Sequence, residues 1–204
     1  MPHRTGQGPT RRRGRALEQA IFDAVFAQLE ASGYARFTMD AAAAAAGTGK
    51  STLYRRWADK DELILDALYH ALPRPTEVPL NGELRADLIA VLTCLRETFE
   101  TTRGTAFQIV KSDVNPQAAL VHTMVKDRVS DPCKQMVLDI LARGAERGEV
   151  RPEAVSPLVA NVGSAMMIHH SLTEGPVSDE LLTAIVDEIV LPLVRLPPGQ
   201  ARTE

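Results

Sequence analysis

The sequence predicts an all-α fold, and three observations point to it. Aromatic residues make up only 4% of the 204 residues, so the core must be built mainly from aliphatic side chains. Ala and Leu dominate these, and both favour helices, whereas strands prefer β-branched and aromatic residues. Apolar residues recur at spacings of three and four along most of the chain, and no segment alternates with period two. The length allows one large domain or two small ones.

The net charge of −3 conceals an uneven distribution. Residues 1–60 contain ten Lys or Arg and five Asp or Glu, a charge of +5, whereas residues 61–204 have a charge of −8. A basic front end on an acidic body is typical of a nucleic-acid-binding head with a separate second domain. Neither a signal peptide nor a membrane-length apolar stretch is apparent, and two cysteines do not make a disulfide framework. We therefore expect a cytoplasmic protein with no membrane association.

Residues 1–14 are expected to form a disordered basic arm, because Arg11–Arg13 stand among Gly, Pro and Thr without apolar periodicity. Such an arm could contact DNA phosphates or a minor groove, or it could be a solvated tail. The first helix is predicted over residues 15–32, where apolar residues at helical spacing form one face. Gly33 is expected to end this helix.

Residues 38–57 are predicted to form two short helices joined by a tight turn. Thr38 is placed to cap the first of them, and the six alanines that follow Asp40 leave little bulk between the helices. Gly47 allows the turn, because glycine tolerates positive φ. The second helix, over residues 50–57, turns Leu53 and Trp57 inward and leaves polar groups outside. These features are those of a helix-turn-helix, whose second helix enters the major groove of DNA.

The polar residues of this segment predict its DNA contacts. Lys50 and Arg55 can donate hydrogen bonds to guanine O6 and N7, and Ser51 can bond to several base edges. Phosphate contacts are predicted for a second group of residues: Thr38, Thr52, Tyr54, Arg56 and Lys60. A fourth helix is expected from Asp59, with Glu62 at the spacing of a capping box.

This segment is similar to the DNA-binding domain of the TetR/AcrR family of transcriptional regulators. The resemblance covers residues 15–70, and its ordered matches are Thr38, Ala43, Ala46-Gly47, Thr52-Leu53-Tyr54-Arg55-Arg56-Trp57, Lys60 and Leu63. It implies an all-α homodimer with an N-terminal three-helix DNA-binding domain and a C-terminal ligand-binding and dimerisation bundle. It also implies a repressor that binds a palindromic double-stranded DNA operator and is released by a small-molecule effector. The chain departs from the family at Ala42, Thr48 and Gly49, which loosens the packing beneath the turn and removes a side-chain cap.

The proline-rich segment 72–82, which ends in Asn81-Gly82, is the best candidate for a domain boundary. We therefore predict a helix-turn-helix domain over residues 15–72 and a C-terminal ligand-binding and dimerisation domain over residues 83–196. Helical periodicity predicts the elements of the second domain, at residues 83–101, 105–112, 116–128, 132–147, 152–172 and 178–196. Pro116 and Pro132 are expected to stand near the starts of their helices, where a missing amide costs little.

The last helix predicts a two-fold dimer, because its apolar face is wider than packing on one neighbour requires. The residues of this double stripe are Leu181, Leu182, Ile185, Val186, Ile189, Val190, Leu193 and Val194. Small residues in the preceding helix would allow close approach: Ala160, Gly163, Ser164 and Ala165. A dimer would also present two recognition helices to two half-sites, although a buried monomer core would account for the same pattern.

A ligand pocket in the C-terminal bundle is predicted from large or adaptable side chains. The candidates are Phe99, Phe107, Met124, Met136, Met166, His169 and His170. The adjacent histidines project about 100° apart on a helix, so they cannot hold one metal ion together. No metal site, cofactor or catalytic group is predicted.

Two other functions fit parts of the sequence. Ala44, followed after four residues by Gly49-Lys50-Ser51, satisfies the loose form of a nucleotide-binding P-loop, but no buried strand precedes it. A helical protein-interaction module would account for the bundle but would leave the basic head unexplained. The sequence therefore favours a DNA-binding regulator that is not an enzyme.

Overall fold

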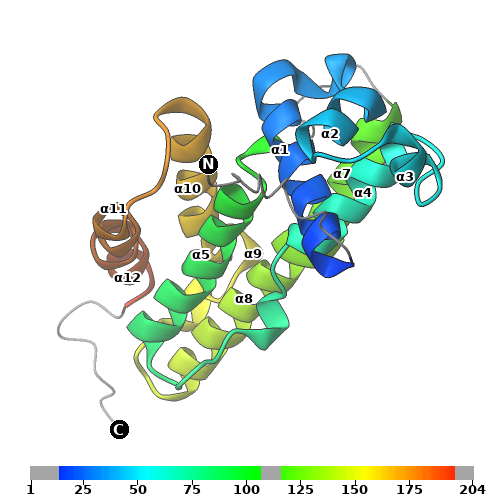
Figure 1. Cartoon of the computed structure of the whole chain (residues 1–204). Helices are drawn as coiled ribbons and strands as arrows, with labels where there is room; N and C mark the ends of the chain where they lie inside the picture. Colours follow the sequence, from blue (N-terminus) through cyan, green and yellow to red (C-terminus); the bar gives the residue numbers. More distant parts are fainter. Residues whose placement is uncertain (1–13, 107–115, 196–204) are drawn as a thin grey trace, which may run out of the picture. The chain divides into compact units, whose positions relative to one another are not determined.

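The computed structural model describes residues 14–106 and 116–195, which form helices and connecting loops with no strand among them (Figure 1). The chain divides into two compact units, Met1–Ala67 and Leu68–Glu204. Val150 and Arg195 form an isolated antiparallel bridge. No helix in the described residues is long and apolar enough to cross a membrane. The predicted all-α class is confirmed.

The first unit contains α1 (Arg15–Arg36), α2 (Met39–Ala45), α3 (Lys50–Tyr54) and the start of α4 (Lys60–Ala71). Helix α1 extends four residues beyond its predicted end, but Gly33, at φ 72° and ψ 170°, interrupts its helical backbone. Helix α2 packs against both α1 and α3. The core of this unit includes Ile21, Val25 and Leu53, which are completely buried.

The second unit begins within α4 and continues through a 3₁₀ turn, η1 (Pro75–Glu77), to α5 (Leu84–Thr101). Its remaining elements are α7 (Pro116–Val125), η2 (Lys126–Ser130), α8 (Asp131–Glu146), η3 (Pro152–Ala154), α9 (Pro157–Ala160), α10 (Val162–Thr173), α11 (Asp179–Ala184), η4 (Ile185–Val190) and α12 (Leu191–Val194). Most of the predicted helix at 105–112 lies outside the described residues. Helix α5 is central, since it packs against α8, α10 and α11.

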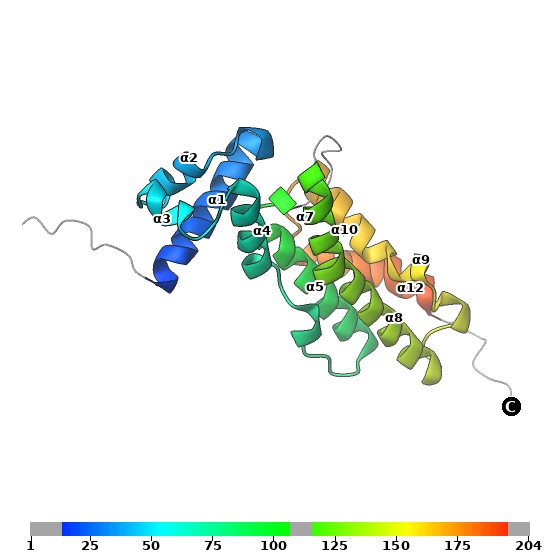
Figure 2. The same cartoon turned by 90° about the vertical axis from the view of Figure 1, so that its right-hand side faces the viewer.

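Helix α8 begins at Asp131 with Pro132 in its first turn, as predicted, but the break expected between residues 128 and 132 is absent. Helices α7 and α8 form one continuous rod through η2, a π turn (Figure 2). The amide of Asp131 donates to the carbonyl of Lys126, five residues earlier. This wider turn makes room for Pro132, which lacks an amide and would otherwise crowd the preceding turn.

The same device recurs near the C-terminus of the second unit. There η4 is also a π turn, and the amide of Leu191 donates to the carbonyl of Val186 immediately before Pro192. The predicted helix 178–196 is therefore continuous through α11, η4 and α12. By contrast, the predicted helix 152–172 is broken into η3, α9 and α10, and the Ser156 hydroxyl caps α9 by accepting from the Val159 amide at 3.3 Å.

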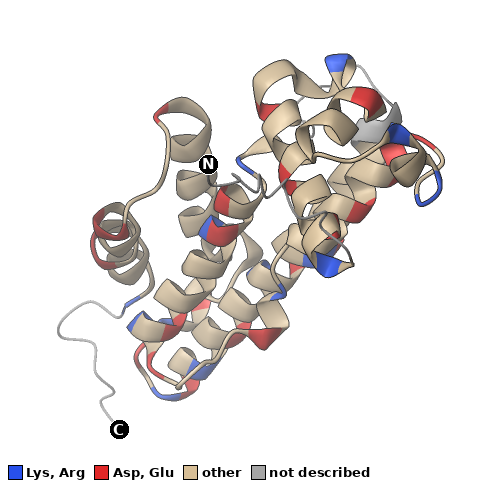
Figure 3. Cartoon of the chain, viewed as in Figure 1, with Lys and Arg blue, Asp and Glu red and all other residues tan. Residues whose placement is uncertain are grey.

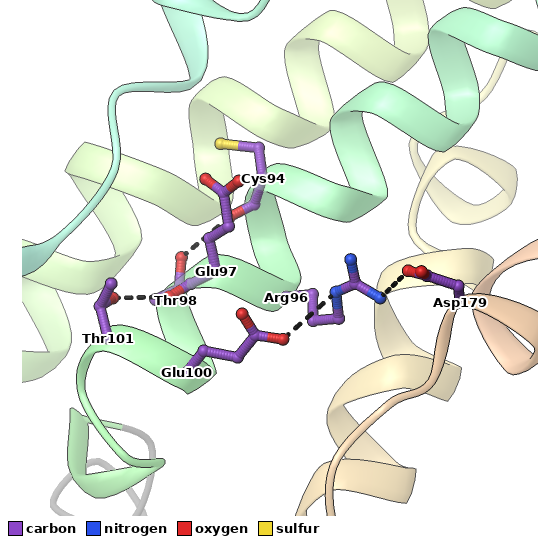
Figure 4. A network of polar contacts seen from close by, with 7 residues as sticks. All are labelled: Cys94, Arg96, Glu97, Thr98, Glu100, Thr101 and Asp179. Carbon is purple, nitrogen blue, oxygen red and sulfur yellow. Dashed lines mark hydrogen bonds and ion pairs between the residues drawn. The ribbon is translucent and has the colours of Figure 1, made fainter.

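Polar contacts join the helices of the second unit. The Arg96 guanidinium lies between Glu100 of α5 and Asp179 of α11 (Figure 4). Arg85 makes two hydrogen bonds, of 2.6 and 2.8 Å, to the carboxylate of Asp187 in η4. Asp87, only 2% exposed, accepts from the amides of Asn81 and Gly82 and so closes the predicted Asn-Gly turn before α5. These contacts hold the C-terminal helices on the scaffold of α5.

Candidate DNA-binding site

Short-range contacts form the two helices of the candidate DNA-binding site. The Thr38 hydroxyl oxygen accepts from the Ala41 amide at 3.2 Å, which confirms the predicted cap of α2. Gly47 has φ 68° and lies in the turn after α2, where a side chain would strain the backbone. Its amide donates to the Ala44 carbonyl at 3.1 Å, and the Thr48 amide donates to Ala43 at 3.0 Å. The turn therefore forms as the sequence predicts.

Helix α3 has a buried side and a polar side. Leu53 is completely buried and Trp57 is 4% exposed, whereas the Tyr54 side of the helix is open. The predicted base-contacting residues Lys50, Ser51 and Arg55 are all exposed. Regular helix ends at Tyr54 rather than Trp57, but the Trp57 amide still donates to Leu53 at 2.9 Å. This bond keeps Trp57 beneath Leu53 on the buried side.

Three of the predicted cationic contacts already have partners within the first unit. Lys50 Nζ lies 2.7 Å from Asp40 Oδ2, and this hydrogen bond raises the pKa of the lysine. Arg56 pairs with Glu18 at 3.1 Å. Lys60 Nζ donates to the Tyr34 carbonyl at 3.3 Å and lies 4.5 Å from the centre of the Tyr34 ring.

Arg55 differs from these three cations, because its side chain makes no hydrogen bond, ion pair or ring contact with any residue in 14–106 or 116–195. It is exposed beside Tyr54, at the end of α3. In Figure 3, basic residues gather on α3 and on the turn after it, next to acidic residues of the same unit. Asp40, which sequence reasoning did not single out, supplies one of these negative charges and faces Lys50.

Trp57 fixes the end of α3 to α4. Its indole Nε1 donates to Asp66 Oδ2 at 2.8 Å, and its ring meets Phe22 edge-on at 6.1 Å between centroids. Asp59 accepts from the amides of Asp61 and Glu62, both at 2.9 Å. The Glu62 carboxylate accepts from the amide of Ala58, whereas a capping box would have it accept from the amide of Asp59. The second hydrogen bond of the predicted capping box is therefore shifted by one residue.

The departures from the family pattern have local consequences in the structure. Gly49 is the N-cap of α3, with φ −81° and ψ 144°, and no side chain caps this helix. Ala42 is completely buried between the helices, so its small side chain reduces the apolar surface that packs there. The P-loop alternative is not favoured, because α2 stands where a nucleotide-binding fold needs a strand.

The second unit contains a cavity of about 160 Å³ between α5, α8 and the α9–α10 segment. None of the predicted pocket residues within the described ranges lines it. Phe99 is buried elsewhere on α5, Met124 and Met136 are half-buried, and Phe107 lies outside the described residues. His169 and Met166 are exposed, and His170 Nδ1 lies 3.4 Å from Glu174. Helical periodicity could not identify the cavity, because its wall combines residues from helices distant in sequence.

The predicted double stripe of the last helix is divided by the fold. Leu182, Ile185, Val186, Val190 and Val194 are buried within the second unit, against elements that include α5 and α10. Ile189 is 40% exposed, and other apolar side chains of this unit are also open, among them Met166 at 39%, Leu120 at 55% and Leu158 at 80%. The chain's own core therefore uses most of the stripe.

Comparison with known proteins identifies both units. The family model "Bacterial regulatory proteins, tetR family" matches residues 21–67, and "Tetracyclin repressor-like, C-terminal domain" matches residues 78–189. The chain is 32% identical over 188 residues to the DNA-binding transcriptional repressor TetR of Mycobacteroides abscessus, covering 92% of this chain and 97% of that protein.

Solved structures show the same fold. The fatty acid degradation regulator FadR from Bacillus halodurans aligns with a TM-score of 0.64 at 15% identity, over 94% of this chain and 100% of that one. The SmeT–triclosan complex aligns with a TM-score of 0.59 at 21% identity, over 93% of this chain and 99% of that one.

Proposed function

Because the chain belongs to the TetR family of bacterial regulators, we propose that it represses transcription as a homodimer on a palindromic operator, from which a small molecule releases it. DNA binding follows from the family and from the helix-turn-helix. The observation that carries the proposal is the two-sided character of α3. Lys50, Ser51 and Arg55 are exposed, whereas Leu53 is completely buried, as a recognition helix requires.

Arg55 is the principal base-contacting residue in this proposal. It is exposed and forms no ion pair among the described residues, so it can reach guanine O6 and N7 without losing an internal partner. Lys50 must first exchange Asp40 for a base edge, although both side chains are more than half exposed, so water can compensate the exchange. Ser51 adds a hydrogen bond that either base type can accept.

The remaining predicted contacts hold the phosphate backbone. Thr38, Thr52, Tyr54, Arg56 and Lys60 fit this role, because they lie between or beside the recognition residues and carry hydroxyl or cationic groups. Lys60 stands at the first residue of α4, where helix amides also attract an anion. Its present contacts to Tyr34 orient the ammonium group and do not neutralise it, since the partners are a carbonyl and a ring.

A homodimer supplies the second reading head. One short recognition helix contacts few bases, whereas two related by a two-fold axis read half-sites about one helical turn, roughly 34 Å, apart. The exposed apolar side chains of Leu158, Met166 and Ile189 support a dimer through the C-terminal unit. They lie on α9, α10 and η4, and α10 packs against both of the other two elements.

The π turn η2 provides a route from a bound ligand to the DNA-binding unit. Ser130 of this turn lines the cavity, and the Arg128 guanidinium lies 4.1 Å from the centre of the Tyr69 ring. Tyr69 belongs to the last turns of α4, the helix that begins at Lys60. A ligand that shifts η2 therefore acts on α4. The ligand can change DNA affinity only by the difference between its binding free energies for the DNA-binding and the released conformation. This difference is typically about 1–3 kcal/mol.

Selection of bound DNA from a random pool tests the proposal. The selected sites should be palindromic, with half-sites about 10 base pairs or a multiple apart. A gel-shift assay at two salt concentrations should then show weaker binding at the higher one. Asymmetric selected sites, or a monomer on the DNA, would contradict the dimer. Binding of ATP in an equilibrium titration would instead support the nucleotide-binding alternative.

A further inference from the structure

The cavity of the second unit is apolar in its interior. Val91, Leu92 and Leu95 of α5 form one wall, with Val137 of α8 and Ile168 of α10 opposite. Its volume, about 160 Å³, suits a single ring or a short aliphatic chain, because an apolar cavity of about 150 Å³ holds one benzene molecule.

Four polar residues also line this cavity, and each is more exposed than the buried apolar residues of α5, so they stand at its edge. Lys134 and Ser130 lie four residues apart across the junction of η2 and α8, and Asn161 and Ser164 lie on the α9–α10 segment. The Ser164 hydroxyl lies within hydrogen-bond distance of the Asn161 carbonyl oxygen and of its side-chain Oδ1, at 3.0 and 3.2 Å. When Oδ1 accepts this bond, the Asn161 NH₂ group is left to act as a donor. The edge therefore presents an ammonium group, an amide donor and a hydroxyl.

No negative charge balances these donors. No Asp or Glu lines the cavity, and Lys134 forms no ion pair with any residue in the described ranges 14–106 and 116–195. Lys134 is also half-buried, so its ammonium group is partly removed from water. Cys133 lines the wall as a neutral thiol, because its hydrogen bond with Cys94, together with burial, raises its pKa. The site therefore has an unbalanced positive charge beside an apolar interior.

We propose that this cavity binds a small amphiphilic anion, namely a carboxylate attached to a single ring or a short aliphatic chain. The apolar body fills the interior, and the carboxylate accepts from Lys134 and from the Asn161 amide at the edge. A neutral ligand of the same shape leaves the half-buried ammonium without a partner, and a cationic one is repelled by it. The ligand class stands on the cavity alone. Its effect on repression rests on the proposed function.

Calorimetric titration of the full-length protein with four probes tests this inference. Benzoate has the required body and charge, benzamide has the body without the charge, benzylamine reverses the charge, and acetate lacks the body. Benzoate should bind about 10- to 100-fold more tightly than benzamide, the value of one charge-assisted hydrogen bond in a partly buried site. Benzylamine and acetate should show no saturable binding at millimolar concentration.

Lys134→Met keeps the length of the side chain and removes its charge, so it should weaken benzoate by the same factor and leave benzamide unchanged. Lys126→Met is the matched control, since this exposed lysine pairs with Asp131 and does not line the cavity. It should leave both affinities as they are. Ile168→Phe narrows the interior and should weaken benzoate and benzamide together. Melting curves and DNA binding without ligand show that each variant is folded.

Equal binding of benzoate and benzamide, or no binding of either, overturns the inference, as does full benzoate affinity in Lys134→Met. Whether the ligand relieves repression is a separate question, and a gel-shift assay with and without benzoate measures its effect on DNA affinity. If benzoate binds as expected but leaves DNA affinity unchanged, the ligand class stands and ligand-relieved repression fails. If another compound releases the DNA while no probe enters the cavity, repression stands and this inference fails.

Discussion

The hydrogen bond between Trp57 and Asp66 gives the sharpest test of how the DNA-binding unit is held together. Asp66→Ala leaves the indole N–H, in a side chain that is 4% exposed, without its carboxylate partner at 2.8 Å. Loss of a hydrogen bond to a charged group typically costs about 1.5–3 kcal/mol. Asp66 is itself half-buried, so water can enter the vacated space and the lower half of this range is expected.

The chain has a single tryptophan, so its fluorescence reports on this site alone. With a urea slope of about 1–1.5 kcal/mol per M for a unit of this size, the unfolding midpoint followed at Trp57 should fall by about 1–2 M. Asp66→Asn keeps an oxygen acceptor and should lose about half as much, because a neutral acceptor forms the weaker bond. An unchanged midpoint in Asp66→Ala would refute the reasoning, and equal losses in the two variants would refute the role of the charge.

Three further predictions concern DNA contacts, the turn and the coupling. Arg55→Ala should cost about 1–3 kcal/mol of operator binding and relax the base preference at one position. Lys60→Ala should weaken binding to all DNA sequences alike and lower by about 1 the slope of log affinity against log salt concentration. An unchanged slope would contradict the phosphate contact of Lys60. Gly47→Ala should reduce the free energy of unfolding by about 1–2 kcal/mol, because its φ of 68° is unfavourable for alanine, and chemical denaturation followed at the tryptophan measures this. Arg128→Met removes the contact with Tyr69, so it should leave DNA affinity without ligand nearly unchanged and reduce the ligand-induced change in gel shifts; a full ligand response would exclude this route.

Interactions within a few residues could be predicted from the sequence. The cap at Thr38, the turn at Gly47 and the Asp59 cap all join atoms at most five residues apart, so residue type and spacing were sufficient. The division of α3 into a buried and an exposed side also follows from helical spacing, because Leu53 is one turn from Trp57. The predicted base-contacting residues Lys50, Ser51 and Arg55 are accordingly exposed in the structure, and their contacts with DNA stay a prediction.

Interactions between distant segments could not be predicted in this way. No pattern in the sequence pairs Lys50 with Asp40 or brings Arg128 over Tyr69, because neither pairing repeats with a helical period. Pro132 illustrates the limit most clearly. Proline usually starts a helix or breaks one, and only the π turn before it shows that α7 and α8 are continuous.

The sequence by itself determined the all-α class, the helix-turn-helix and its exposed polar face, because these depend on periodicity and on capping within one or two turns. The tertiary structure decided which apolar residues of the last helix serve the chain's own core and where the second unit leaves a cavity. The physical reason is that a cavity is the space left by several packed helices. Lys134 has no special position in its own helix and gains its significance from the apolar walls that α5 and α10 place beside it.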